Sequence, residues 1–177
     1  LPNSENITYV AVDFTNQSLT EQLMDAGFDQ SRPSVFTLEG VSQYITKEAF
    51  SSMIKEVATL TQTSSSIFFI SYVSKLLDKN PEACFGKGYP NAEKRAKLIT
   101  YGSAKAGEPW ISFYSAEEIE NALSQNGYSV KENVTLKDLN SRYFAPVGRA
   151  LSENQLLVLE HFVVSESQNS SLLSGNS

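Results

Sequence analysis

The chain has 177 residues, of which 41% are hydrophobic and 19% are charged, so it is long enough to bury one sizeable core and has the composition of an ordinary globular domain. Its formal net charge is -6. This balance excludes a general nucleic-acid surface, because phosphate binding depends on clustered Lys and Arg, and we expect no nucleic-acid partner.

The single cysteine, Cys84, excludes an intrachain disulfide and any multi-cysteine metal site. The longest apolar run, residues 67–73, is far shorter than the roughly 20 residues that a membrane-spanning helix needs. We therefore predict a protein of the cytoplasm, with no signal peptide, no contact with the membrane and no metal ion.

The first part of the chain predicts strand, helix and strand in turn. Residues 7–14 are rich in β-branched and aromatic side chains and reach Asp13 near their end, which is typical of a strand. Ser18 and Glu21 have the spacing of a capping box and predict the start of a short helix. Residues 34–39 predict a second strand that also ends on a carboxylate, that of Glu39.

The next elements continue this alternation. Thr46 is a suitable N-cap for a helix over residues 47–60, whose apolar side chains recur at the spacing of a core-facing stripe. Residues 66–73 form an almost unbroken apolar run, which is the pattern of a central strand covered on both faces. The repeated order of strand, helix and strand predicts an α/β fold with a mostly parallel sheet and right-handed crossovers.

The signals for secondary structure in residues 78–127 differ in strength. Residues 78–90, with two prolines and two glycines, predict little regular structure, and we interpret this stretch as an insertion beside a pocket. A helix is expected over residues 92–104. A second capping box, Ser115 to Glu118, begins a helix that ends at Asn126-Gly127.

The last two strands are expected over residues 128–134 and 156–165, with a helical turn over 136–144 between them. The chain thus forms a single domain over residues 1–165. Residues 166–177 are rich in Ser, Asn and Gln and are predicted to be a disordered tail.

Two predicted strands end on acids, Asp13 and Glu39. In an open parallel sheet, ligands bind beyond the carboxyl ends of the strands, where loops converge. A carboxylate there accepts hydrogen bonds from ribose hydroxyls, an amino group or an ammonium, which suits a nucleoside-bearing ligand. The alternative is that each acid caps the loop that follows, and the spacing alone does not decide between the two.

Several stretches of the sequence together form a recognisable pattern. They are Val12-Asp13-Phe14, Ala26-Gly27-Phe28, Arg32 to Ile45, Thr46-Lys47-Glu48, Gly107-Glu108-Pro109-Trp110 and Ala122 to Tyr128. The most specific is a strand that ends in Glu-Gly, followed by a Tyr before a helix. This pattern resembles the leucine carboxyl methyltransferase-like family, a class I family of O-methyltransferases that use S-adenosylmethionine. The resemblance covers nearly all of residues 7–165 and implies a Rossmann-like sheet with an antiparallel last strand.

The resemblance also implies roles for particular residues. Asp13 and Phe14 would flank the adenine of S-adenosylmethionine, and Glu39 would line the cleft near its methionine part. Tyr44 would border the pocket of the methyl acceptor, and Trp110 could roof it, although packing alone explains a buried aromatic residue. Methyl transfer needs alignment and a dry cleft more than a covalent nucleophile, so no catalytic residue is assigned.

The chain departs from the family pattern at its beginning. The glycine-rich loop that cradles the cofactor, and the acidic strand end that holds its ribose, would lie before Leu1. Residues 7–14 would then be a strand without a neighbouring strand, and the sheet would have an exposed edge with unpaired backbone groups. We therefore predict that an N-terminal fragment or a second chain completes the sheet.

Two functions stay open at this stage. The first is an O-methyltransferase that modifies a carboxylate or hydroxyl of a small molecule or a protein, and that needs the missing N-terminal part. The second is a catalytically silent, methyltransferase-like module whose exposed edge recruits a partner. A dehydrogenase half is disfavoured, because no Gly-x-Gly-x-x-Gly follows any strand.

Overall fold

The computed structural model describes residues 6–14, 16–85 and 89–168. The strands are β1 (Val35–Leu38), β2 (Ile67–Val73), β3 (Tyr128–Thr135) and β4 (Glu160–Ser167). The α-helices are α1 (Leu19–Asp25), α2 (Lys47–Leu60), α3 (Leu76–Lys79), α4 (Pro81–Phe85), α5 (Ala92–Lys105), α6 (Ala116–Gln125) and α7 (Leu136–Leu139). A π-helical turn, η1 (Asn140–Phe144), continues α7, and two 3₁₀ turns follow at Ala145–Val147 and Glu153–Gln155.

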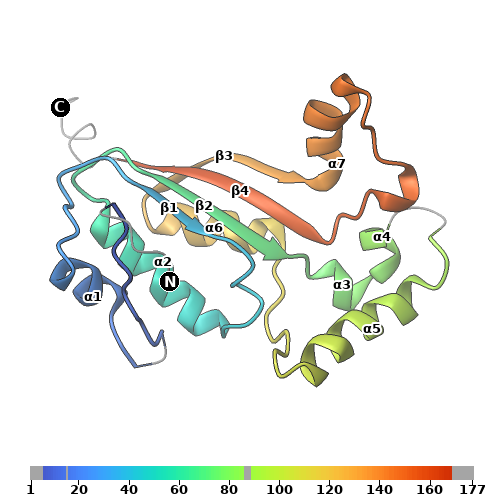
Figure 1. The fold of residues 1–177 in the computed structure, drawn as a ribbon, viewed down its shortest axis with the longest axis horizontal. Helices are drawn as coiled ribbons and strands as arrows, with labels where there is room; N and C mark the ends of the chain where they lie inside the picture. Colours follow the sequence, from blue (N-terminus) through green and yellow to red (C-terminus); the bar gives the residue numbers. More distant parts are fainter. Residues whose placement is uncertain (1–5, 15, 86–88, 169–177) are drawn as a thin grey trace.

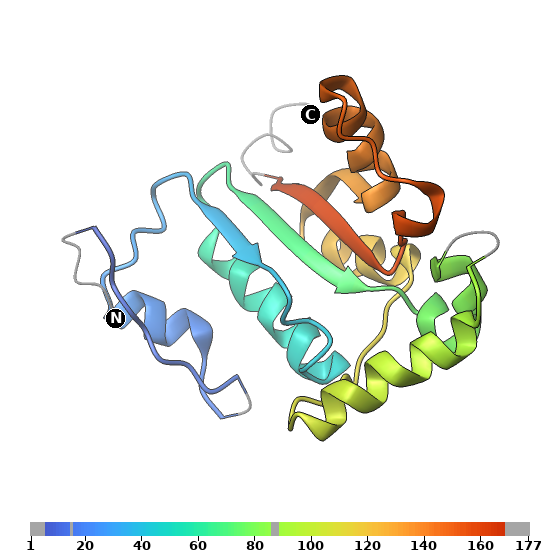
Figure 2. The same cartoon turned by 45° about the vertical axis from the view of Figure 1, so that its right-hand side comes forward.

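The four strands form one sheet in the order β1-β2-β4-β3 (Figures 1 and 2). β1 pairs with β2 in parallel, with Val35 opposite Ile67 and Leu38 opposite Ile70. β4 is antiparallel to both of its neighbours, β2 and β3, so β1, β2 and β3 all point the same way. The predicted fold class, a mostly parallel α/β sheet with an antiparallel last strand, is confirmed.

One face of the sheet carries the main core. α2 and α6 lie side by side on this face (Figure 1) and contribute Phe50, Ile54, Ile119 and Leu123, which pack against Phe68 and other side chains of the sheet. Each of these side chains is at most 2% exposed. Burying one large apolar side chain contributes roughly 1.5–3 kcal/mol, so this layer stabilises the sheet strongly.

The opposite face of the sheet is incompletely covered. Side chains alternate between the two faces of a strand, so Ile67 and Phe69 point away from the main core. Ile67 is 41% exposed, and Val35, its partner on β1, is 67% exposed. Phe69 stacks on Phe162 of β4, and both are only partly buried. The prediction that β2 is central is confirmed, but on the second face its expected cover is found only toward the carboxyl end of the strand, where Ser71 and Val73 are buried.

The prediction of a strand over residues 7–14 is wrong. The described residues 6–14 have no regular structure and lie beside α1, outside the sheet (Figure 2). Ile7, Tyr9 and Phe14 are 49%, 52% and 37% exposed. A strand is stable only when its backbone groups pair with a neighbour, and residues 6–14 pair with no strand among the described residues.

The helix α1, by contrast, is tied firmly to α2. Its N-cap Ser18 accepts a hydrogen bond from the Glu21 N–H, as the capping pattern predicted. Ser18 Oγ also donates to Glu56 Oε2 over 2.6 Å, and the Thr20 N–H donates to the same oxygen over 2.9 Å. One carboxylate on α2 therefore accepts hydrogen bonds from the first turn of α1.

Three further boundaries differ from the sequence prediction. Residues 78–90 were expected to be irregular but contain the short helices α3, in part, and α4, while 86–88 lie outside the described residues. β4 begins at Glu160 rather than 156, because Val158 and Leu159 form backbone hydrogen bonds with Cys84 and Ser74 instead of pairing in the sheet. β4 also runs to Ser167, so the predicted tail cannot begin at 166; residues 169–177 lie outside the described part of the chain.

Candidate functional site

The loop after β1 is fixed at the carboxyl edge of the sheet. Glu39 follows the last residue of β1 and is exposed, and Gly40 turns the chain with a φ of 65°, which a side chain would disfavour. The Gly40 N–H donates to Ser71 Oγ over 2.9 Å, and Ser42 Oγ donates to the Ser71 carbonyl, also over 2.9 Å. These bonds hold the Glu39 loop against the neighbouring parallel strand, β2.

A second segment, residues 107–113, anchors the other side of this loop. The Ile111 N–H donates to the Gln43 carbonyl over 2.8 Å, and Ser112 Oγ donates to the Ile45 carbonyl over 2.7 Å. Tyr44, between these two anchors, is 38% exposed. It lines a hollow of about 390 Å³ with the residues Gly107, Glu108, Pro109 and Ile111.

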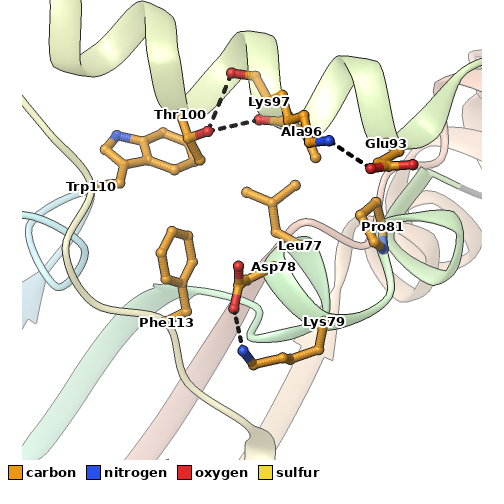
Figure 3. A pocket seen from close by; sticks show the side chains of 10 residues that line it. All are labelled: Leu77, Asp78, Lys79, Pro81, Glu93, Ala96, Lys97, Thr100, Trp110 and Phe113. Atoms are coloured by element: carbon orange, nitrogen blue, oxygen red, sulfur yellow. Dashed lines mark hydrogen bonds and ion pairs between the residues drawn. The ribbon is translucent and has the colours of Figure 1, made fainter.

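Trp110 lies on the other side of the same segment. It lines a larger hollow of about 460 Å³, together with Phe113 and residues of α3, α4 and α5 (Figure 3). The two residues expected in one acceptor pocket, Tyr44 and Trp110, therefore line two neighbouring hollows with residues 107–113 as their shared wall. Their roles toward a substrate stay predictions.

Asp13 and Phe14 lie in the irregular segment before α1, not at the end of a strand. The Asp13 carboxylate accepts a hydrogen bond from Asn16 Nδ2 over 2.8 Å, and its carbonyl accepts from the Gln17 N–H over 2.8 Å. These bonds form a local turn, the structural role that the sequence left open for an acid at this position. Their predicted contact with a cofactor also stays a prediction.

Two lysines and one glutamate join three elements at the same edge. Glu118 Oε1 lies 2.8 Å from Nζ of Lys47, at the start of α2, and 3.2 Å from Nζ of Lys75, which follows β2. Its other oxygen, Oε2, accepts from the Ser115 N–H in the capping box of α6. Burial acts to raise the pKa of Glu118, but these hydrogen bonds outweigh it and lower the pKa from 4.5 to about 2. We call Lys47, Lys75 and Glu118 the edge cluster.

The sequence showed only part of the edge cluster. The Ser-x-x-Glu spacing identified Glu118 as a capping residue, and the structure confirms that role. Nothing in the spacing indicated the two lysines, because Lys47 lies 71 positions and Lys75 lies 43 positions before Glu118 in the sequence. These contacts depend on how α2, α6 and the end of β2 pack together, which no local spacing shows.

Two other side chains that could be reactive, those of Cys84 and His161, are packed against other side chains. Cys84 is fully buried in a second core cluster, and burial raises the pKa of its thiol to about 11, so the thiol stays protonated. The His161 ring stacks on Tyr72 with their centroids 5.0 Å apart, and burial lowers the pKa of His161.

Within the described ranges, no group of three or more His, Cys, Asp or Glu side chains is placed to hold a metal ion. Over the same residues, none of the helices is both long enough and apolar enough to cross a membrane.

The sequence and the structure were compared with those of known proteins. Residues 1–58 match the model of the leucine carboxyl methyltransferase family. The chain is 30% identical over 141 residues to YktD of Bacillus subtilis (strain 168), which is provisionally named an S-adenosyl-L-methionine-dependent methyltransferase. That match covers 79% of this chain but 42% of YktD, so the chain spans less than half the length of this relative.

Solved structures share the fold at low identity. A DUF574 family protein from Streptomyces avermitilis superposes with a TM-score of 0.57 at 15% identity, covering 90% of this chain and 54% of that protein. A provisionally named methyltransferase from Thermobifida fusca gives a TM-score of 0.51 at 16% identity, covering 89% and 52%. The mycolic acid cyclopropane synthase CmaA1, in a complex with SAH and CTAB, also gives 0.51, at 13% identity, covering 81% and 57%.

At these identities the structural matches establish a shared fold and nothing more, while the sequence matches bear on the family. The family model, over residues 1–58, and the YktD relative both agree with the resemblance to the leucine carboxyl methyltransferase family that the sequence carries.

Proposed function

We propose that this chain is part of an S-adenosylmethionine-dependent O-methyltransferase that modifies a carboxylate or a hydroxyl. The observation that carries the proposal is the exposed carboxylate of Glu39 at the carboxyl end of β1, on a loop locked to the parallel strand β2. Ligands of open α/β sheets bind at this edge. The name of the YktD relative supports the same cofactor.

The residues at this edge fit the polar groups of such a cofactor. Glu39 is placed to accept hydrogen bonds from hydroxyl or ammonium groups, and the hydrogen-bonded loop holds the backbone that carries its side chain at the edge of the sheet. In the proposal, Asp13 and Phe14 hold the adenine. Because residues 6–14 are outside the sheet, their contact with the cofactor would require the segment to move to the edge or to pair with an added strand.

When bound, S-adenosylmethionine supplies a sulfonium methyl group that an acceptor oxygen takes by in-line displacement, while the electrons of the broken C–S bond stay on sulfur. The part of the protein is to align the acceptor and exclude water. A carboxylate acceptor has no proton to lose, whereas a hydroxyl must release one. Tyr44 and Trp110 would contact the acceptor from their two hollows.

The proposal includes a further polypeptide segment that completes the sheet. The outer edge of β1 and the second face of the sheet expose Val35 and Ile67, and Phe69 is only partly covered. Exposed apolar side chains along an unpaired edge favour the addition of strands and helices from elsewhere. An N-terminal fragment or a second chain would also give residues 7–14 a strand to pair with.

Calorimetry with S-adenosylmethionine tests the cofactor assignment. The protein is purified under native conditions, together with any polypeptide that completes the sheet. We expect binding, and we expect Glu39→Gln and Asp13→Ala each to weaken it about tenfold or more, as when a charged hydrogen-bond acceptor is lost. Glu21→Gln, an exposed carboxylate in α1, is the matched control and should bind normally.

Absence of binding by the complete assembly would contradict the proposal and favour the catalytically silent module. Binding that is unchanged in both variants would remove Asp13 and Glu39 from the cofactor site.

A further inference from the structure

The larger hollow lies directly beyond the carboxyl end of β2. Ser74 and Lys75 follow this strand, and α3 begins at Leu76. In Figure 3, α3 forms one wall of the hollow and α5 the opposite wall, while Trp110 and Phe113 close one side. The volume of about 460 Å³ is within the range of sites that bind small molecules.

Half of the residues that line the hollow are apolar, and two of these, Trp110 and Phe113, are aromatic. Leu77 is 2% exposed and Ala96 is 5% exposed, and the rings of Trp110 and Phe113 are partly buried. Figure 3 shows both rings on the same side of Leu77. Aromatic walls of this kind bind flat apolar groups by stacking or edge contacts.

The charged groups at the hollow neutralise one another. Lys79 Nζ lies 2.7 Å from Asp78 Oδ2, and Lys97 Nζ lies 2.6 Å from Glu93 Oε1 (Figure 3). The net charge of the four charged side chains that line the hollow is therefore zero, and each cation lies beside an anion. Among the described residues that line the hollow, each cation is paired with an anion, so a carboxylate ligand would compete with Asp78 or Glu93 for its cation, and an ammonium ligand would compete with Lys79 or Lys97.

We propose that this hollow binds the methyl acceptor, and that the acceptor is an uncharged, hydroxyl-bearing aromatic molecule rather than a carboxylate or a protein chain end. That the bound molecule is a methyl acceptor rests on the proposed function. That the hollow binds an aromatic molecule rests only on the residues that line it. Transfer to such an acceptor forms an O–CH₃ bond, breaks the S–CH₃ bond and releases the hydroxyl proton to solvent.

Trp110 is the only tryptophan of the chain, so its fluorescence reports on this hollow directly. The probes are biphenyl-4-ol and its matched anion biphenyl-4-carboxylate, each titrated into the natively purified protein with excitation at the red edge of the tryptophan band. We expect saturable quenching by biphenyl-4-ol, with the carboxylate about tenfold weaker or more. Equal binding of the two probes, or no saturable change, would overturn the proposal.

Variants locate the binding. Ala96→Phe and Thr100→Phe place a ring in the hollow from α5, and either should weaken biphenyl-4-ol binding about tenfold or more. Ala104→Phe, at an exposed position of the same helix, is the matched control and should bind normally. Circular dichroism confirms that each variant is folded, and a folded Ala96→Phe and a folded Thr100→Phe that both bind like the parent would overturn the proposal.

The same samples keep the two proposals apart. If biphenyl-4-ol binds but S-adenosylmethionine does not, the hollow is a ligand site and the proposed methyltransferase function fails. If S-adenosylmethionine binds but biphenyl-4-ol does not, the function stands and the assignment of this hollow fails. With both bound, mass spectrometry should detect 4-methoxybiphenyl, and methylation of biphenyl-4-carboxylate alone would overturn the choice of acceptor.

Discussion

Replacing Glu118 by glutamine should remove the charge that holds the edge cluster together while keeping the shape of the side chain. In the folded protein the pKa of Glu118 is about 2, against an ordinary value of 4.5. The full difference corresponds to roughly 3 kcal/mol. The Glu118 side chain is 35% exposed, so screening by solvent lowers our expectation to about 1–2 kcal/mol of unfolding free energy at pH 7.

The stabilisation by Glu118 should depend on pH, and the direction follows from its lowered pKa. The lowered pKa means that the folded state favours the charged carboxylate, so the stabilisation is complete above the unfolded pKa of about 4.5 and is lost as the pH falls toward 2. Urea unfolding at pH 7, 4 and 2.5, followed by circular dichroism, measures the difference between parent and Glu118→Gln. That difference should shrink steadily over this range.

The matched control is Glu117→Gln, on the same first turn of α6 but exposed. Both carboxylates interact with the helix dipole, whereas the contacts with Lys47 and Lys75 belong to Glu118. If the two variants lose equal stability, or if the effect of Glu118→Gln does not depend on pH, the edge cluster contributes nothing beyond an ordinary helix cap and the reasoning is refuted.

Three further outcomes are expected of the core. Ile54→Ala should lower the unfolding free energy by about 2–5 kcal/mol in urea, because Ile54 is 0% exposed under the sheet; a loss below 1 kcal/mol would contradict the packing described. Tyr128→Phe should cost about 1 kcal/mol in the same assay, because its hydroxyl lies 2.7 Å from buried Thr61 Oγ1, and an unchanged midpoint would argue against that bond. Cys84 should resist iodoacetamide at pH 8 in the folded protein and react in urea, because burial raises its pKa to about 11; rapid labelling of the native protein would show that the second core cluster opens.

Local patterns in the sequence predicted the longer helices and the strands β1, β2 and β3, and the reason is physical. α2 has its predicted bounds because the Thr46 N-cap and the apolar stripe are both short-range signals. α6 begins after its predicted capping box for the same reason. Residues 7–14 have an equally clear strand pattern, yet form no strand, because a strand also needs a neighbour, which no local pattern supplies.

The site was less predictable than the fold. The position of Glu39 at the end of β1 followed from the strand pattern, and its loop is where the parallel sheet requires it. The separation of Tyr44 from Trp110 was not predictable, because it depends on hydrogen bonds from Ile111 and Ser112 to a loop more than sixty residues earlier. A sequence pattern gives the identity of these side chains but not the side of the segment on which each lies.

The topology explains why both hollows lie at this edge. β2 ends at Val73, and α6 begins at Ala116, so the whole stretch between them must leave and re-enter the fold at the carboxyl end of β2. The Tyr114 N–H donates to the Val73 carbonyl over 3.0 Å, which closes this excursion at its base. The side chains of α3 and α5 can therefore change the shape and charge of the larger hollow without disturbing the sheet, while Ile111 and Ser112 keep the Glu39 loop in place. In the proposed methyltransferase, the acceptor could change in this way while the cofactor edge stays fixed, which is why we assign the choice of acceptor to α3 and α5 together with Trp110 and Phe113.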